Sequence, residues 1–112
     1  MTFDSSKIRV IDISSMTVPE LISEIEKNPK NWLGEKDIKY LNVFLNGYFH
    51  GKNFSDDSNM IYEFGRFIED RFNVRTTEGW AKIIESNSEN GQLAIDNFFN
   101  FFREFLQCQE KT

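Results

Sequence analysis

Hydrophobic and polar positions recur with a helical period over most of this chain. The clearest stripe lies in the segment 93–108, LAIDNFFNFFREFLQC, which places apolar residues at i, i+3, i+4 and i+7: Ile95, Phe98, Phe99, Phe102, Phe105 and Leu106. A second, overlapping row consists of Ala94, Phe98, Phe101, Phe105 and Cys108. Because a stripe this wide needs neighbours on two sides, the pattern predicts that this helix is the centre of a small bundle.

Two helices are predicted in the first half of the chain. The first has a capping box, with Thr17 as its N-cap and Glu20 three residues later, and it ends before Pro29 because the residue before a proline is pushed out of the helical region. The second spans about 36–50. Gly47 lies inside it, and either a close helix crossing or a kink would explain it; we favour the crossing.

Two more helices are predicted between these and the last one. One ends near Phe72, where Asn73 suits a left-handed cap, and a short one runs through Trp80. The N-caps expected for the short helix and for the last helix are, respectively, Thr76 or Thr77, and Ser88 or Asn90.

The whole pattern predicts one all-α domain over residues 1–112, a compact five-helix bundle preceded by an extended N-terminal arm at 1–16. Within that arm, the β-branched segment 7–13, KIRVIDI, leaves two interpretations open. It is either a short strand or an extended segment packed on the helices.

Composition narrows the class of protein. Twelve phenylalanines in 112 residues need a core, which argues against disorder. Eighteen acidic and 13 basic residues give a net charge of -5, which disfavours nucleic-acid binding and suits a protein that docks on a basic partner. The opening sequence MTFDSSKIRV lacks the apolar run of a signal peptide, no stretch has the length of a membrane span, and a single cysteine permits no internal disulfide. We therefore expect a soluble, cytoplasmic protein.

Candidate chemistry is sparse, and we do not expect an enzyme. The one histidine, His50, and the one cysteine, Cys108, are the only nucleophile–base pair of that type, no third orienting group accompanies them, and the cysteine is expected among phenylalanines, where thiols are usually inert. Metal and phosphate motifs are missing as well, so we expect no metal and no cofactor.

Acidic and large aromatic side chains are the remaining candidates. The acids gather at six positions: Asp56, Asp57, Glu63, Glu69, Asp70 and Glu78. Such clusters are most often solvated surface, and in the remaining cases they are where a basic partner docks. Among the aromatics near element ends or loops, Trp80 is the best candidate for an interface anchor, although such residues more often cover a small core.

Four stretches together resemble small bacterial immunity proteins, which accompany polymorphic or contact-dependent growth-inhibition toxins. They are YLNVFLNGYFHG (40–51), FGRFIEDRFNV (64–74), GWAKIIE (79–85) and AIDNFFNFFREFL (94–106). The likeness is one of overall character over about residues 30–107: small, acidic, aromatic-rich and without catalytic residues.

The resemblance implies a non-catalytic protein that binds one cognate toxin domain, often a basic nuclease, and occludes its active site. In that case the acidic set steers association, and three aromatic residues anchor the complex: Tyr48, Tyr62 and Trp80. Two other classes stay open, a helical regulatory or adaptor protein with a non-toxic partner, and a bundle with an aromatic-lined cavity for an apolar ligand. The sequence leaves the binding face and the oligomeric state, monomer or weak dimer, undecided.

Overall fold

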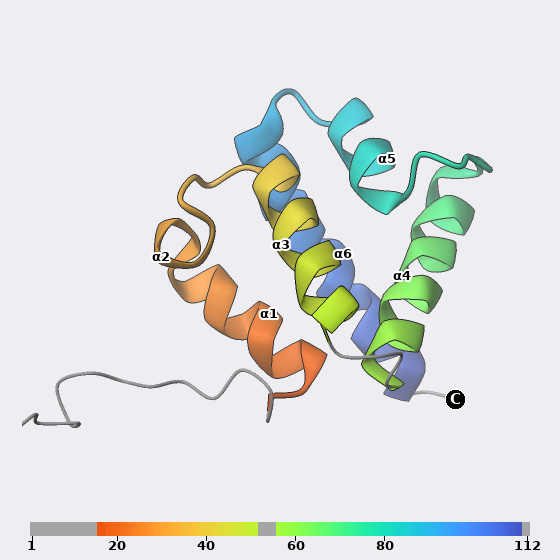
Figure 1. Cartoon of the computed structure of the whole chain (residues 1–112). Coiled ribbons are helices and arrows are strands. Elements are labelled where there is room, and N and C mark those ends of the chain that lie inside the picture. Colours follow the sequence, from red (N-terminus) through yellow and green to blue (C-terminus); the bar gives the residue numbers. More distant parts are fainter. Residues whose placement is uncertain (1–15, 52–55, 111–112) are drawn as a thin grey trace, which may run out of the picture.

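The computed structural model describes residues 16–51 and 56–110, but not the side chains of residues 49–51, 56–59 and 110. All regular secondary structure in this part of the chain is α-helix, as predicted (Figure 1). Its helices are α1 (Val18–Lys27), α2 (Pro29–Leu33), α3 (Ile38–Gly51), α4 (Asp56–Phe72), α5 (Trp80–Ser86) and α6 (Gly91–Glu110). The described residues thus hold six helices, one more than predicted, and the segment 7–13 lies outside them.

The additional helix is the connector after α1. Asn28 ends α1, its N–H donating to the carbonyl of Ile25, and Pro29 immediately starts a further turn. Proline suits the first helical position because its fixed φ is helical and its missing N–H has no intrahelical partner there. Gly34, at φ 85°, ends α2 by donating its N–H to the carbonyl of Lys30.

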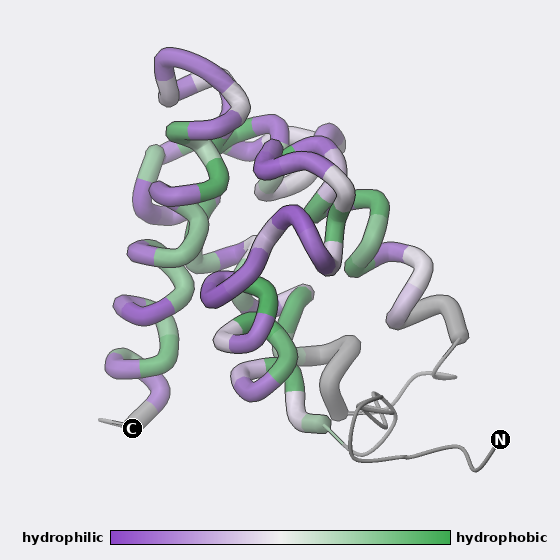
Figure 2. Tube along the Cα trace, turned by 90° about the vertical axis from the view of Figure 1, so that its left-hand side faces the viewer, coloured by the Kyte–Doolittle hydropathy of each residue, from purple (hydrophilic) through white to green (hydrophobic). Residues whose placement is uncertain are grey.

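α6 is the longest of these helices and organises the others. It lies behind α3 and crosses the whole molecule (Figure 1). It contacts α3, α4 and α5, and its hydrophobic side faces the bundle while its polar side faces outward (Figure 2). Five residues of the predicted stripe are buried and the sixth, Leu106, is partly buried; the buried residues are Ile95, Phe98, Phe99, Phe102 and Phe105. Ala94, of the second row, is buried as well.

The centre of the core is a cluster of aromatic rings around Phe64 of α4. The Phe64 side chain has no solvent exposure. Its ring centroid lies 5.3–6.3 Å from those of five other rings: Phe67, Trp80, Phe98, Phe102 and Phe105. Most of these pairs are edge-to-face, the geometry in which the positive edge of one ring meets the negative face of another. One residue therefore joins α4, α5 and α6.

Three helix ends have the capping residues predicted from the sequence, and one has a different residue. The capping box of α1 is present, and Asn90 caps α6 by accepting the N–H of Leu93 at 2.8 Å. Asn73 is left-handed at φ 55°, and the N–H of Val74 reaches back to the carbonyl of Glu69, which closes α4 in a Schellman motif. The N-cap of α5 is Gly79 and not a threonine.

The two helix-interior glycines behave differently. A Cβ at Gly65 would lie 3.7 Å from Cδ1 of Trp80, so α4 and α5 cross closely there. At Gly47 no atom of the described residues lies within 4 Å of that position. The close crossing predicted at Gly47 is therefore wrong, because α3 turns this residue toward solvent.

Truncation of the central ring should remove most of the stability. We expect Phe64→Ala to lower the free energy of unfolding by about 3–5 kcal/mol, because it empties the space shared by α4, α5 and α6. The half-buried Phe101, which contacts Phe72 and Arg71 at the edge of the core, is the matched control and should lose only about 1–2 kcal/mol as Phe101→Ala. Urea unfolding followed by circular dichroism measures both; equal losses would contradict the central place of Phe64.

The capping box should also make stability depend on pH. The pKa of Glu20 is lowered from its ordinary value of 4.5, chiefly because its carboxylate accepts the backbone N–H of Thr17 at 2.9 Å. A carboxyl with a depressed pKa in the folded state stabilises the fold above its unfolded-state pKa, and loses that contribution as the pH falls through the folded value.

Glu20→Gln keeps the cap acceptor and removes the charge. We expect the wild type to melt at a higher temperature than Glu20→Gln at pH 7, with the difference shrinking as the pH is lowered below 4.5. Thermal unfolding at a series of pH values checks this. A difference that stays constant down to pH 3 would show that the charge has no part in the cap.

Candidate protein-binding surface on α4

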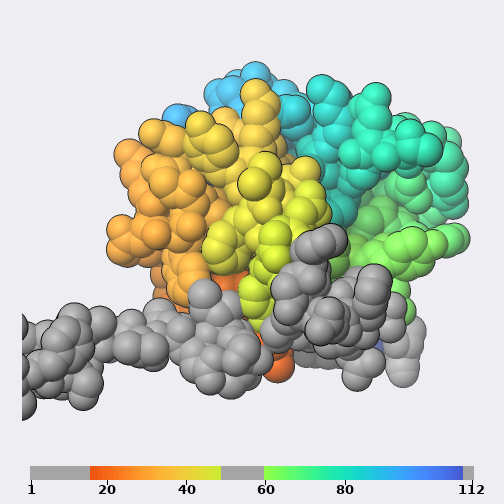
Figure 3. All heavy atoms as spheres, viewed as in Figure 1, coloured from red at the N-terminus to blue at the C-terminus, as the bar shows by residue number. Residues whose placement is uncertain are grey.

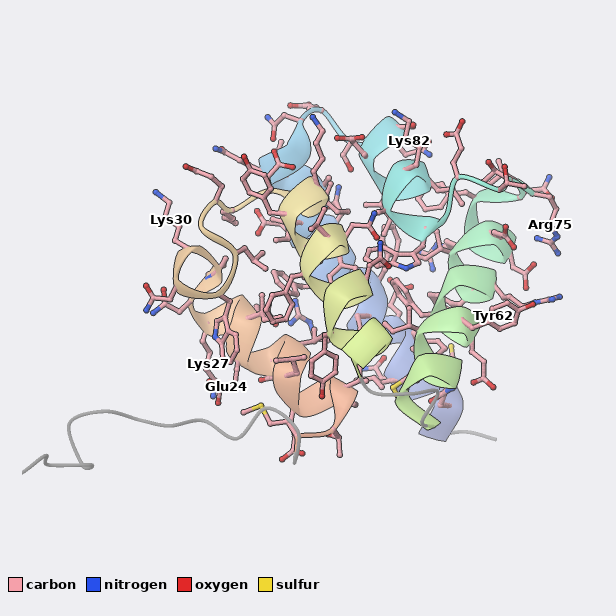
Figure 4. All side chains as sticks on the ribbon, viewed as in Figure 1. Glu24, Lys27, Lys30, Tyr62, Arg75 and Lys82 are labelled. Atoms are coloured by element: carbon pink, nitrogen blue, oxygen red, sulfur yellow. The ribbon has the colours of Figure 1, made fainter. Side chains whose placement is uncertain are left out.

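The outer side of α4 carries an exposed ridge. Because α4 buries Phe64 and Ile68 against the core, the helical period turns intervening residues toward solvent. Tyr62 is 66% exposed and points away from the bundle (Figure 4). We call the following set the α4 ridge: Tyr62, Glu63, Arg66, Glu69 and Asp70.

A hollow lies on each side of the α4 ridge. One, of about 410 Å³, separates α4 from α6 and has the rings of Phe67 and Phe105 in its wall, with Glu63, Arg66 and Asp70 at its rim. The other, of about 320 Å³, separates α4 from α5. It is lined by Ile61, Tyr62, Gly65, Arg66, Glu69, Gly79 and Trp80. An aromatic ridge between two partly apolar hollows can interdigitate with side chains of another protein.

Hydrogen bonds and ion pairs hold the ridge side chains in place. Arg75 lies 2.9 Å from Asp70 and 3.9 Å from Glu69, and Gln109 donates to Glu63 at 2.9 Å. The pKa of Arg66 is raised from its ordinary value, chiefly by the Tyr62 side chain, which lies one helical turn earlier on α4.

The charge of this surface is only slightly negative. The α4 ridge and Arg75 together hold three carboxylates and two guanidiniums, which leaves one net negative charge. Arg71 points the other way, where it pairs with Glu104 of α6 and lies over the Phe101 ring.

The structure brings four of the nine sequence-predicted binding residues together on the α4 ridge: Tyr62, Glu63, Glu69 and Asp70. Asp56 and Asp57 are the first residues of α4, and their side chains are outside the described set. Glu78 precedes α5 and lines a different hollow. Tyr48 of α3 is half-buried, and its hydroxyl donates to the carbonyl of Met16 at 3.4 Å.

Trp80 is not the exposed anchor that the sequence suggests. Its side chain is 9% exposed, and its ring lies 5.0 Å from Phe98 and 5.6 Å from Phe64. Because α5 begins at Trp80 and packs directly on α6, the indole becomes part of the core and of the wall of the α4–α5 hollow.

The surface that the sequence does not reveal is a groove between α3 and α5. With about 470 Å³ it is larger than either hollow beside α4, and it lies where these two helices run side by side (Figures 1 and 3). Its lining consists of Ile38, Lys39, Asn42, Val43, Glu78, Ala81, Lys82 and Glu85. The one feature of the sequence that points to this groove is Val43, an apolar residue that lies off the buried stripe of α3 and is 69% exposed.

Side chains for metal or covalent chemistry do not gather in the described residues. No three of their histidine, cysteine, aspartate and glutamate side chains are placed to hold a metal ion. Cys108 is exposed, so its predicted burial is wrong: it lies near the end of α6, on the rim of the α4–α6 hollow. Among the described residues, no helix is long and apolar enough to cross a membrane.

Comparison of the chain with protein-family models, with curated proteins and with solved structures gives no match.

The reactivity of the Cys108 thiol tests directly whether the C-terminal end of α6 is exposed. We expect the native protein to react with a thiol reagent such as DTNB at one equivalent, at a rate within a few-fold of that in denaturant, because an exposed thiol needs no unfolding to react. A native rate slower by several orders of magnitude would show that this end of α6 is covered.

Proposed function

We propose that this chain is a non-catalytic protein-binding module, and that it acts as an immunity protein whose α4 ridge binds a cognate bacterial toxin domain and blocks its active site. The observation that carries the proposal is Tyr62, two-thirds exposed on a helix flanked by two hollows. The resemblance to immunity proteins in size, acidity and aromatic content supports the choice of partner.

Tyr62 has the properties of an interface anchor. Tyrosine buries a large rigid surface on binding while its hydroxyl keeps a polar contact, and such residues dominate the energy of many interfaces. Its phenol lies one helical turn before Arg66, and both side chains line the α4–α5 hollow. The hollows beside it then accept the partner's own side chains.

The carboxylates of the ridge suit a basic toxin. Glu63 and Asp70 are seven residues apart, so they lie on the same face of α4, at the rim of the α4–α6 hollow. Two exposed carboxylates above an aromatic wall complement lysine and arginine side chains and speed their approach.

A second function is a helical adaptor that binds a non-toxic protein. The observation that favours it is the small net charge of the α4 surface, where Arg66 and Arg75 offset two of the three carboxylates. A partner for such a surface need not be strongly basic. The salt dependence of binding separates the two: complex formation with a basic nuclease weakens steeply with salt, whereas binding to a neutral partner does not.

The proposal is tested with the product of the gene immediately upstream, expressed with and without this protein. We expect the upstream product to arrest growth and this chain to restore it, with nanomolar binding between the purified proteins. A harmless, non-binding neighbour would remove the immunity function and leave the adaptor.

Single-residue variants test whether Tyr62 contacts the toxin. We expect Tyr62→Ala to weaken binding at least tenfold, because it removes the anchor. The matched control is Tyr40→Ala, which removes an exposed tyrosine (48%) from α3 and should change affinity less than twofold. Calorimetry or surface plasmon resonance measures both, and equal effects would place the contact elsewhere.

Charge reversal tests the role of the carboxylates separately. We expect the double variant Glu63→Lys/Asp70→Lys to lower the association rate and to flatten its dependence on salt, since steering depends on these charges. Glu89→Lys, in the exposed link before α6, is the matched control. An association rate that is unchanged in the double variant would remove Glu63 and Asp70 from the interface.

A further inference from the structure

The groove between α3 and α5 has an apolar floor and an exposed apolar wall. Ile38 and Ala81, at 1% and 8% exposure, form the floor. Val43 stands beside them with 69% of its surface in water. A molecule that covers Val43 removes this apolar surface from water, which favours its binding.

The two ends of this groove carry opposite charges. At one end Lys39 and Lys82 lie 3.7 and 3.8 Å from the carboxylate of Glu85, which leaves one net positive charge there. At the other end Glu78 has no ion pair with any residue that the structure describes. Glu78 precedes α5 and Glu85 lies in its last turn, so the two charged ends lie at opposite ends of α5.

We propose that the α3–α5 groove binds an amphipathic helix of another protein, running antiparallel to α5. Two adjacent helices with an apolar floor and a polar rim make the surface on which such a helix lays its apolar face. A bound helix with a carboxylate at i, aliphatic residues at i+3 and i+4, and a lysine or arginine at i+7 presents all four on one side.

The direction of the bound helix follows from charge. An acidic residue is most favourable near a helix N-terminus and a basic one near its C-terminus. The acidic end of the incoming helix pairs with Lys39 and Lys82, beside the C-terminal end of α5, and its basic end pairs with Glu78. The incoming helix therefore runs opposite to α5. α5 itself separates this groove from the α4–α5 hollow, so the site is distinct from the α4 ridge.

The test uses two fluorescein-labelled peptides of about 15 residues. The first has glutamate at i, leucines at i+3 and i+4 and lysine at i+7; the second exchanges glutamate and lysine. We expect the first peptide to bind the full chain several-fold more tightly than the second by fluorescence anisotropy. We expect Val43→Asp to weaken its binding about tenfold, while Val74→Asp, at an exposed valine outside the groove, leaves it within twofold.

A charge-swapped chain gives the decisive comparison. Glu78→Lys/Lys82→Glu exchanges the net charges of the two ends, so it should prefer the second peptide. Circular dichroism confirms that each variant is folded. Equal affinity for both peptides, no loss in Val43→Asp, or amide shifts confined to α4 in nuclear magnetic resonance would overturn the proposal. Sedimentation that shows the chain dimerising through Val43 would overturn it too, because a second copy would then be the occupant.

Discussion

Burial of the Phe64 ring among rings of α4, α5 and α6 is the contact on which the rest of the structure depends. It sets the rotation of α4 about its own axis, and this rotation decides which residues reach solvent. With Phe64 and Ile68 inward, Tyr62 and its neighbours must point out. The same ring holds Trp80 at the start of α5, and α5 in turn forms one wall of the α3–α5 groove. The packing of the core around Phe64 therefore also shapes the α4 ridge and the α3–α5 groove.

The parts of the fold that depend on local chemistry could be predicted from sequence. The capping box at Thr17, the left-handed Asn73 and the stripe of α6 each follow from neighbouring residues alone, and the structure contains all three. The helix α2 does not show in the sequence pattern because its five residues are too few to show a period. Its proline, which ends α1, also starts the next turn.

The candidate surface was only partly predictable, because exposure depends on contacts between distant helices. The sequence marks Tyr62 and Trp80 alike as large aromatics near element ends, and only the packing of α5 on α6 separates the exposed ring from the buried one. Val43 and Ala81 line one groove from helices far apart in the chain, so no spacing rule could join them. Cys108 follows the hydrophobic row of α6, yet it lies at the exposed end of that helix.

Hydrogen–deuterium exchange can show whether a partner binds the outer side of α4, as proposed. The chain alone would be compared with its complex with the product of the upstream gene. We expect slower exchange in the complex for amides of α4, residues 60–72, with those of α1 unchanged, because a bound partner suppresses local opening where it contacts the chain. Protection confined to α1 and α2, with α4 exchanging as in the free chain, would show that the partner does not bind the outer side of α4.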